Sequence, residues 1–410
     1  MRQCGPEEEG GGETGGRVRK RKILSLVGTR PEAVKMAPVL LELARHRGRL
    51  DSLLVSTAQH REMLDQILSV FGVVPDVDFN IMRPNQTLFD ITARTLAGMR
   101  DLLERLSPDL LLVQGDTTAV FAASLAAFYL RIPVGHVEAG LRSYDLANPY
   151  PEEMNRRFAG MIATLHFAPT QRARQSLLRE GVAPERIFVT GNPVVDALQT
   201  ALPKLRGEGI DGIPREALRY GKIILVTAHR RENHGRPLEN ICLAVREVIR
   251  LHPDVRCIYP VHLNPQVRQT VYRLLGGVER VHLIPPLDYW SFIQLMARSF
   301  LVLTDSGGVQ EEAPSLGKPV LVLRKVTERP EAAETGLAKV IGTDTRVVVA
   351  ETSALLRDAR LYHRMVQQEN PYGDGKAALK IVAAIRDYFA GGEERGDTDA
   401  RFPQVNDNLL

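Results

Sequence analysis

Short, continuous apolar runs alternate with amphipathic segments along most of this chain. A strand that is apolar at every position is buried on both faces, as in parallel sheets that helices cover from both sides. Segments such as 34–44 and 88–106 carry apolar residues at i, i+3 and i+4, the spacing of an amphipathic helix. The apolar runs form two series, 23–27, 52–56, 110–114, 133–137, 165–169 and 187–190, then 223–227, 256–261, 281–284, 301–304 and 319–323. This alternation predicts an α/β fold built on parallel sheets.

The two series are separated by a segment without clear periodicity. Residues 201–220 contain two prolines and three glycines, which is typical of a linker between domains. A length of 410 residues suits two domains of about 150–200 residues each. We therefore expect two Rossmann-like domains facing a central cleft, over 22–200 and 221–370, the second of them nucleotide-binding. A helix is expected within 371–390, and residues 1–21 and 391–410 are expected to be disordered tails.

Charge and cysteine content narrow the class of protein. The chain has 53 basic and 49 acidic residues, a net charge of +4, so neither nucleic-acid nor membrane partners are expected. The longest apolar stretch without charges, 117–130, is shorter than the ~20 residues that cross a bilayer. Cys4, Cys242 and Cys257 are too few and too scattered for a disulfide framework or a zinc site. These features predict a protein of the cytoplasm.

Ligands bind at the carboxyl ends of parallel strands, so the residues that follow each run are the candidates for a site. The run 23–27 is followed by Gly28-Thr29-Arg30-Pro31-Glu32, and Lys35 lies early in the next helix. Arg30 and Lys35 place two cations beside a helix N-terminus, which already favours anions. The alternative is an ordinary strand–helix turn with two surface cations.

Three carboxylates follow strands or open helices in the first half of the chain. Asp116 follows 110–114, Glu138 follows 133–137, and Glu152 opens a helical segment after two prolines. Carboxylates gathered at one edge of a sheet suggest acid–base chemistry or a metal site. The structural alternatives are a helix N-cap for Asp116 and complementation of a helix dipole for Glu152.

The second half supplies a histidine, cations and a glycine-rich helix start. His229 and Arg230 follow 223–227, and Ser306-Gly307-Gly308 follows 301–304, where backbone N–H groups could approach a diphosphate. Glu312 could accept hydrogen bonds from a ribose diol, and Arg329 adds a cation. Neither the P-loop pattern nor G-x-G-x-x-G occurs, and the histidines lack metal-ligand spacing. We therefore expect no metal and no other cofactor.

Taken together, these motifs resemble those of the non-hydrolysing UDP-N-acetylglucosamine 2-epimerases over roughly residues 22–389. The stretches that carry the resemblance are Gly28–Glu32, Gln114–Thr118, His136–Arg142, Pro151–Arg156, Thr227–Asn233 and Thr304–Pro314. The resemblance implies the glycosyltransferase-B architecture, with a C-terminal helix that crosses back to the first domain. It also implies interconversion of UDP-GlcNAc and UDP-ManNAc in the cytoplasm, without metal or nicotinamide, by a homodimer. In bacteria the ManNAc product of that family feeds surface polysaccharide synthesis.

The resemblance also implies roles for particular residues of this chain. The acid–base groups of the family fall on Asp116, Glu138, Glu152 and His229. Its nucleotide and phosphate contacts fall on Arg30, Lys35, Arg156, Phe292, Ser306, Gly307, Gly308, Glu312 and Arg329. Some bacterial members bind UDP-GlcNAc at a second, activating site, whose contacts fall around Gln59, His60, Gln86, Arg230 and His262.

In the family reaction, UDP leaves C1 as the C2 proton is removed, and it then adds back to 2-acetamidoglucal. Carboxylates suit that proton transfer, while cations and helix ends suit the departing diphosphate. We expect Asp116 to be the base at C2, with Glu138 and Glu152 in return protonation or orientation and His229 at the diphosphate or sugar.

Other functions stay open at the level of sequence. They are a 2-epimerase of a related sugar such as UDP-2,3-diacetamido-glucuronate, a retaining glycosyltransferase of the same fold, a hydrolysing relative that releases ManNAc, and a nucleotide-sugar sensor. A transferase would need an acceptor site and would have little use for three carboxylates in its first domain.

Overall fold

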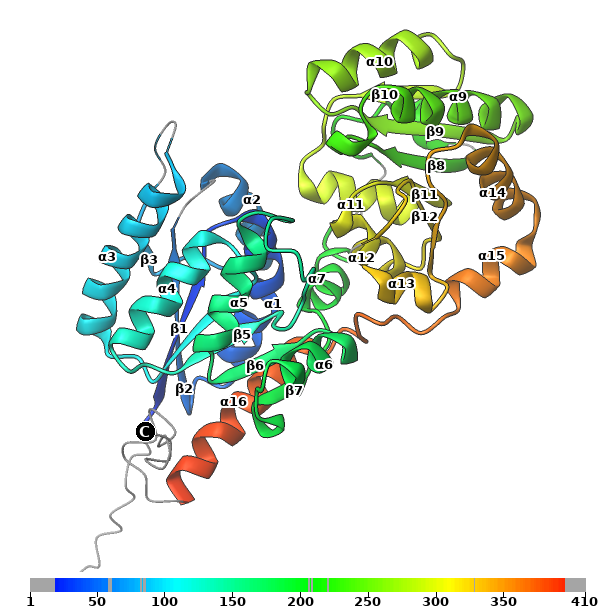
Figure 1. Cartoon of the computed structure of the whole chain (residues 1–410). Coiled ribbons are helices and arrows are strands. Elements are labelled where there is room, and N and C mark those ends of the chain that lie inside the picture. Colours follow the sequence, from blue (N-terminus) through cyan, green and yellow to red (C-terminus); the bar gives the residue numbers. More distant parts are fainter. Residues whose placement is uncertain are drawn as a thin grey trace, which may run out of the picture.

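Two parallel sheets, each flanked by helices, form the two domains of this chain (Figure 1). The computed structural model describes residues 19–57, 61–81, 83, 86–205, 207, 209–219, 221–327 and 329–394. Residues 1–18 and 395–410, which make up most of the two expected tails, lie outside the described residues. The predicted α/β architecture with two parallel sheets is confirmed.

The first sheet has the strand order β3-β2-β1-β4-β5-β6-β7, with every neighbouring pair parallel. Its strands are β1 (Arg21–Val27), β2 (Leu50–Ser56), β3 (Val77–Asp78), β4 (Leu110–Gln114), β5 (Val134–Val137), β6 (Leu165–Ala168) and β7 (Ile187–Val189). Leu110 and Leu112 of β4 pack in one core, whereas Leu111 and Val113 pack in another. The sheet is therefore buried on both faces, as its continuous apolar runs predict.

Several helices of the first domain begin at a side-chain cap. Thr87 caps the helix predicted over 88–106, because its hydroxyl accepts a hydrogen bond from the Asp90 N–H at 3.2 Å. The helices are α1 (Arg30–Arg45), α2 (Arg61–Phe71), α3 (Leu88–Leu106), α4 (Thr118–Tyr129), α5 (Glu152–Ile162), α6 (Gln171–Arg179), the 3₁₀ helix η1 (Pro184–Arg186) and α7 (Pro193–Ala201).

The second sheet has the order β10-β9-β8-β11-β12-β13 and is also parallel throughout. Its strands are β8 (Lys222–Thr227), β9 (Val255–Pro260), β10 (Val281–Ile284), β11 (Leu301–Thr304), β12 (Val320–Val322) and β13 (Ala338–Val340). The helices of this half are η2 (Arg231–Asn233), α9 (Arg236–Leu251), α10 (Pro265–Leu275), α11 (Tyr289–Arg298), α12 (Gly307–Ser315), α13 (Pro330–Glu334), α14 (Thr345–Arg357) and α15 (Ala359–Val366).

Each sheet contains one point at which the direction of strand addition reverses. In the first sheet it lies between β1 and β4, and in the second between β8 and β11. At such a switch point the connections leave toward opposite faces and open a crevice at the carboxyl ends of the strands. Of the residues in which the sequence predicts a site, Arg30, Asp116, His229 and Ser306 follow these four strands, whereas Glu138 follows β5.

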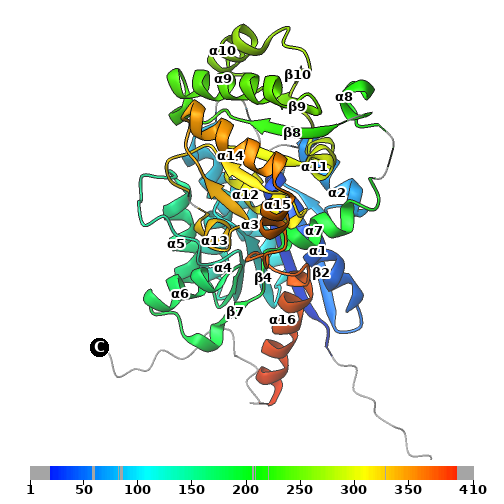
Figure 2. The ribbon, with the colours of Figure 1, turned by 90° about the vertical axis from the view of Figure 1, so that its right-hand side faces the viewer.

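The last helix, α16 (Ala377–Glu394), lies against the first domain although it follows the second (Figure 2). Asp196 of α7 accepts hydrogen bonds from the N–H groups of Ala377 and Ala378 at 3.1 and 2.9 Å, so the first domain caps this helix. Ile381 and Ile385 are buried in the core of the first domain. The crossing back of the C-terminal helix is confirmed.

The structure corrects or extends the sequence analysis at three places. Helix α16 extends through Glu394, into the segment 391–410 that its glycines and acids suggested was a tail, because a helix that has already formed can propagate through poor helix formers such as Gly391 and Gly392. The expected linker 201–220 contains the short helix α8 (Arg215–Arg219). The edge strands β3 and β13 were not predicted, because two or three residues are too short to show a pattern.

None of the helices in the described part of the chain combines the length and the apolar character needed to cross a membrane.

Candidate functional site

A cavity of about 330 Å³ lies between the two domains, at the carboxyl ends of both sheets. From the first domain it is lined by the start of α1, including Arg30 and Lys35, and by Val194 of α7. From the second domain it is lined by Thr227, His229, Pro260, His262, Pro286, Leu287, Tyr289, Phe292, Ser306, Gly308, Val309, Glu311 and Glu312. Cationic, acidic and aromatic groups thus meet where the two domains face each other.

The loop after β1 turns sharply to deliver Arg30 to this cavity. A side chain at Gly28 would bring its Cβ to 2.2 Å from the Thr57 hydroxyl oxygen, so the turn requires glycine. The Arg30 guanidinium lies 5.6 Å from the centroid of the Tyr289 ring on α11. A cation–π contact of this kind is worth about 0.5–2 kcal/mol, and here it joins the two domains.

Glu32 ties the loop after β1 to the loop after β4. One of its carboxylate oxygens accepts hydrogen bonds from the Gly28 and Thr29 N–H groups at 2.5 and 3.0 Å. The other accepts a hydrogen bond from the Thr117 hydroxyl at 2.7 Å. Burial raises the pKa of Glu32 to about 7, against the effect of these donors. A single carboxyl group therefore holds both loops at the first switch point.

Asp116 lies in the loop after β4 but does not cap α4. The N-cap is Thr117, whose hydroxyl accepts a hydrogen bond from the Val120 N–H, so the capping interpretation of Asp116 is wrong. One oxygen of Asp116, Oδ2, pairs with Arg156 of α5, and the other has no partner among the described residues. Asn155 donates to the Asp116 carbonyl at 3.0 Å. The backbone of Asp116 is therefore held while one carboxylate oxygen stays available.

Glu138 is buried and held by donors on three sides. Its backbone has a φ of +65°, a costly conformation for a residue other than glycine. Its carboxylate accepts hydrogen bonds from Lys35 at 2.5 Å, from Asn192 at 3.0 Å and from Gln114. Burial opposes ionisation, but Lys35 and the other donors hold the pKa of Glu138 below its ordinary value. Glu138 is therefore an anion fixed in place.

Glu138 belongs to a buried ion network that crosses between the domains. Lys35 lies 4.0 Å from Glu311 on α12 of the second domain, and Asn192 donates to both carboxylates. Arg329 completes the network by pairing with Glu311. Burial alone would lower the pKa of Lys35, but the two carboxylates raise it above its usual value. The network therefore keeps its charges and joins α1 to α12.

Glu152 begins α5, as predicted, and stands apart from this network. It is half-buried and forms no hydrogen bond or ion pair with the described residues. The adjacent Glu153 is fully buried and accepts hydrogen bonds from the N–H groups of Ser143 and Tyr144 at 3.0 and 3.3 Å. Glu153 thus stabilises the local structure, whereas Glu152 is available to a ligand.

In the second domain, the loop after β8 places His229 in the cavity wall. Its ring stacks on that of His262, with 5.1 Å between centroids and 6° between planes. Asp305, directly after β11, accepts hydrogen bonds from the N–H groups of His229 and Arg230, both at 2.9 Å. Burial lowers the pKa of His229, and the opposing effect of Asp305 does not restore it. The imidazole is therefore neutral at neutral pH.

The N-terminus of α12 lies at the cavity. Ser306 and Gly308 line it, and a Cβ at Gly308 would meet no protein atom within 4 Å. The first N–H groups of a helix have no intrahelical partner and attract anions, so this end suits a phosphate. Further along the helix, Glu312 accepts a hydrogen bond from the Tyr289 hydroxyl at 2.8 Å, and burial raises its pKa to about 7.

The sequence is closely similar to a group of known enzymes. The sequence model of the family described as UDP-N-acetylglucosamine 2-epimerase matches residues 42–386. A UDP-N-acetylglucosamine 2-epimerase of Salmonella typhimurium is 52% identical over 372 residues, which are 90% of this chain and 99% of that protein. The chain belongs to the UDP-N-acetylglucosamine 2-epimerase family. It is therefore an epimerase, one class of isomerase.

Solved structures of this epimerase family share the fold over both domains. A Neisseria meningitidis UDP-GlcNAc 2-epimerase bound to UDP-GlcNAc is 48% identical, with a TM-score of 0.79 over 89% of this chain and 100% of that one. A UDP-GlcNAc 2-epimerase from Methanocaldococcus jannaschii is 32% identical, with a TM-score of 0.79 over 90% of this chain and 99% of that one. The two-domain architecture is thus that of glycosyltransferase-B-like epimerases.

The structure brings most of the predicted site residues of this epimerase together. The cavity wall contains Arg30, Lys35, His229, His262, Phe292, Ser306, Gly308 and Glu312. Glu138 and Arg329 adjoin this wall through their contacts with Lys35 and Glu311. Gly307 follows Ser306 as the first residue of α12.

Other predicted residues are not part of the described cavity wall. Asp116 and Arg156 pair with each other beside the first switch point, and Glu152 lies one turn before Arg156. Of the expected activating site, Arg230 does not line the cavity, and Gln86 precedes α3, where its side chain accepts a hydrogen bond from the Arg83 N–H at 3.2 Å. Gln59 and His60 lie outside the described residues. No three His, Cys, Asp or Glu side chains in the described ranges are grouped to hold a metal ion.

Sequence reasoning missed several residues that hold this site together. Asp305 stands directly after β11, so the rule that found Asp116 could have found it too, whereas Glu32 lies in the first turn of α1, beyond the end of β1. Asn192 follows β7 and carries the same signal. Glu311 and Tyr289 lie within helices, and only the packing of the two domains brings them to the cavity.

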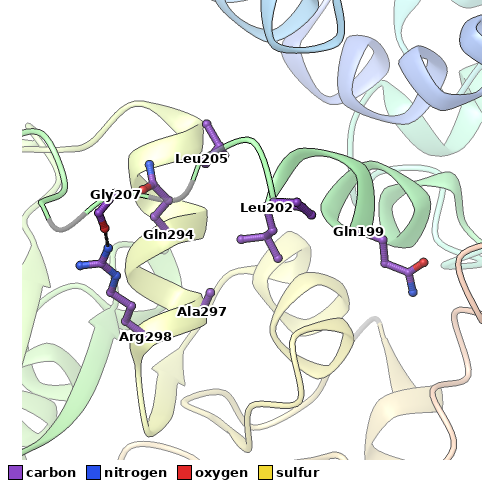
Figure 3. A pocket seen from close by; sticks show the side chains of 8 residues that line it. Gln199, Leu202, Leu205, Gly207, Gln294, Ala297 and Arg298 are labelled. Atoms are coloured by element: carbon purple, nitrogen blue, oxygen red, sulfur yellow. Dashed lines mark hydrogen bonds between the residues drawn. The ribbon is translucent and has the colours of Figure 1, made fainter.

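A second pocket, of about 440 Å³, lies beside the chain that leaves α7 (Figure 3). Leu202 borders it on that side, and Gln294, Ala297 and Arg298 of α11 face it from the other. Arg298, the one charged side chain of the described lining, donates a hydrogen bond to the Gly207 carbonyl. The pocket is not at the strand ends, and its described lining contains no carboxylate or histidine, so the cavity between the domains is the candidate active site of the epimerase.

Proposed function

We propose that this epimerase interconverts UDP-GlcNAc and UDP-ManNAc by inverting C2 of the sugar. The observation that supports this most strongly is the cavity between the domains, where diphosphate-binding groups adjoin a set of acidic side chains. The Neisseria relative bound to UDP-GlcNAc supports the same substrate. The expected domain limits, 22–200 and 221–370, place this cavity between two units that can close on a ligand.

The reaction is proposed to proceed by elimination, because C2 is not adjacent to a carbonyl and its hydrogen is hardly acidic. A protein base takes the C2 proton, the C1–O bond to UDP breaks, and a C1=C2 double bond forms, which gives 2-acetamidoglucal and UDP. Addition of UDP to C1 and of a proton to the opposite face of C2 completes the inversion. Closure of the domains would keep water away from the glucal.

The departing diphosphate is the main charge to be stabilised. Arg30 and Lys35 from the first domain and the N-terminus of α12 from the second can contact it from two sides. Such preorganised donors often make the largest contribution to catalysis. Phe292 offers an apolar face to the nucleotide, and Glu312 an acceptor for its ribose.

The acidic residues differ in their availability for proton transfer. Asp116 has one oxygen for which the described residues offer no partner, which supports it as the base at C2. Glu152 has no partner among the described residues, which supports a role in return protonation. Glu138 is held by three donors and suits orientation, since it fixes Lys35. His229 is placed to assist at the diphosphate or the sugar.

The setting and assembly of the enzyme are also proposed. A reducing cytoplasm suits Cys242 and Cys257, which are both buried free thiols, and a role in supplying surface polysaccharide synthesis follows from the product. A homodimer is supported by a cluster of exposed apolar residues on α4 and α5. This α4–α5 patch consists of Phe128, Tyr129, Met154, Phe158 and Met161. Exposed apolar clusters of this kind typically mark protein interfaces.

Incubation of the protein with UDP-GlcNAc in D₂O should yield UDP-ManNAc, with deuterium at C2 of both sugar nucleotides. The reason is that the elimination route exchanges the C2 proton with solvent through protein groups. The measurement is ¹H NMR of the reaction over time. Product without deuterium at C2 would overturn the elimination mechanism.

The same spectra separate the competing functions. Free ManNAc would indicate a hydrolase. Turnover of UDP-2,3-diacetamido-glucuronate but not of UDP-GlcNAc would show that the former is the substrate. Binding without turnover would indicate a sensor, and turnover only with an added acceptor would indicate a transferase.

Asp116→Asn should keep its fold and its UDP affinity yet lose about 10²-fold or more in kcat. Thr117 still caps α4, and the amide oxygen can still accept from Arg156, but the amide cannot take a proton from carbon. A matched control is Asp101→Asn, which removes the charge from an exposed Asp–Arg pair on α3 and should leave kcat unchanged. Full activity of the Asp116 variant would transfer the role of base to Glu152 or Glu138.

Gly308→Val should weaken UDP binding at least tenfold while leaving the melting temperature within a few degrees of wild type. A Cβ here meets no protein atom, yet it occupies the approach to the first N–H groups of α12. The measurement is calorimetric titration with UDP beside a melting curve. Gly48→Val, which also points into open space but lies at the surface away from the cavity, is the control. Unchanged UDP affinity would remove the phosphate role from this helix start.

Met161→Glu should convert the dimer to a monomer, because it puts a charge into the α4–α5 patch at Met161, which is 82% exposed. Sedimentation velocity measures the mass. Leu379→Glu on α16 is the control, since it charges an exposed apolar residue outside the patch and should leave the dimer intact. A dimer that survives Met161→Glu would place the interface elsewhere.

A further inference from the structure

Asp305 is a buried carboxylate of which only one oxygen is satisfied. Its side chain is fully buried directly after β11. Oδ2 accepts three hydrogen bonds, from the N–H groups of His229 and Arg230 and from the Asn233 side chain, each at 2.9 Å. Oδ1 has no hydrogen-bond partner among the described residues, although a buried carboxylate oxygen left without one costs about 1–3 kcal/mol or more. The three hydrogen bonds to Oδ2 account for the burial of this oxygen and hold the loop after β8. They do not account for the burial of Oδ1.

The imidazole of His229 lies close to this oxygen. Nδ1 of His229 lies 3.8 Å from Asp305 Oδ1, somewhat beyond the ~2.7–3.2 Å of a hydrogen bond. The ring is free to move by that amount on its cavity side, since 39% of the His229 side chain is exposed there. The ring is stacked on His262, so a movement within the plane of the ring keeps this contact.

The backbone bonds of Asp305 make the pair a rigid unit. β8 and β11 are neighbouring strands with Thr227 opposite Thr304, so the loops that carry His229 and Asp305 leave the sheet side by side. The carboxylate of Asp305 accepts the hydrogen bond of the His229 backbone N–H. It therefore holds the backbone that carries the imidazole. A small rotation of the side chain then suffices to bring Nδ1 to Oδ1.

We propose that Asp305 is a positioning residue for His229: its Oδ1 accepts the Nδ1–H of the imidazole, which leaves Nε2 of His229 as a hydrogen-bond acceptor facing the substrate. This inference rests on the proposed function, because it gives His229 its task there. Asp305 does not touch the substrate itself. A neutral imidazole carries one proton, and the partner of one ring nitrogen decides what the other can do.

Asp305→Asn tests this pairing with little change to the loop. The amide oxygen takes over the three hydrogen bonds at Oδ2, since all three partners are donors. The amide NH₂ then occupies the place of Oδ1 and can only donate, so it should bind Nδ1 as an acceptor and shift the proton to Nε2. The tautomer should therefore invert while the fold is kept.

The measurement is long-range ¹H–¹⁵N NMR of the ring nitrogens in protein labelled with [¹⁵N]histidine, with and without UDP. The chain has ten histidines, and the spectrum of His229→Gln identifies the signals of His229. Wild type should show the Nδ1–H tautomer, at least when UDP is bound, and Asp305→Asn the Nε2–H tautomer. The variant should lose at least about tenfold in kcat with little change in KM.

Asn233→Ala is the matched control, because it removes another hydrogen bond of the same carboxylate without facing the imidazole. A merely structural role of Asp305 predicts similar losses in both variants and no change of tautomer, and that result would overturn the proposal. An Nε2–H tautomer in the wild type, free and bound to UDP, would overturn it as well, and this observation does not depend on the folding of the Asp305 variant.

The experiment also separates this inference from the proposed function. If the tautomer inverts as expected but the protein turns over no UDP-sugar, the pairing stands and the function fails. If the protein is an active epimerase and His229 keeps its tautomer in Asp305→Asn, the function stands and the pairing fails.

Discussion

The arrangement of the site depends on the buried ion network between Lys35, Glu138, Glu311 and Arg329. Charges taken out of water are costly unless each is paired and hydrogen-bonded, and here each has at least one partner of opposite sign. Removal of one member of such a network typically costs about 3–5 kcal/mol, because its partner is left charged and buried. The network therefore fixes the position of one domain relative to the other, so that α1 and α12 face each other across the cavity.

The two domains hold the loops at their switch points in the same way. At each switch point, one buried carboxylate ties together the two loops between which a ligand must enter. In the first domain Glu32 binds the loop after β1 and the hydroxyl of Thr117 after β4. In the second, Asp305 after β11 binds the loop after β8 through the N–H groups of His229 and Arg230. The side chains that face the cavity are thus carried by loops whose backbones are already held in place. This reduces the conformational entropy that is lost when a ligand binds.

The fold could be predicted in large part because strands buried on both faces have a strong signal. The strands over 110–114, 281–284 and 301–304 coincide with their apolar runs, whereas β3 and β13 at the sheet edges are too short to have one. The rule that sites follow strands found Asp116, Glu138 and His229. It gave Asp116 a capping alternative that Thr117 excludes, because both residues are good caps and only geometry distinguishes them. Glu311 could not be found in this way, since it lies within a helix and two of its partners, Lys35 and Asn192, come from the other domain.

The crossing of α16 back to the first domain means that the chain passes between the domains twice, after α7 and again before α16. The second passage is fastened next to the first: the Asn192 N–H donates to the Tyr372 carbonyl at 2.7 Å, and the Gln199 side chain donates to the Asp374 carbonyl. Two connections restrict the relative movement of two domains more than one connection does. Rotation about the line that joins the connections is the movement that they oppose least. We expect these two connections to favour a hinge-like rotation of one domain against the other over twisting or sliding of the domains. Each closure then returns the same groups to the same places on either side of the bound ligand.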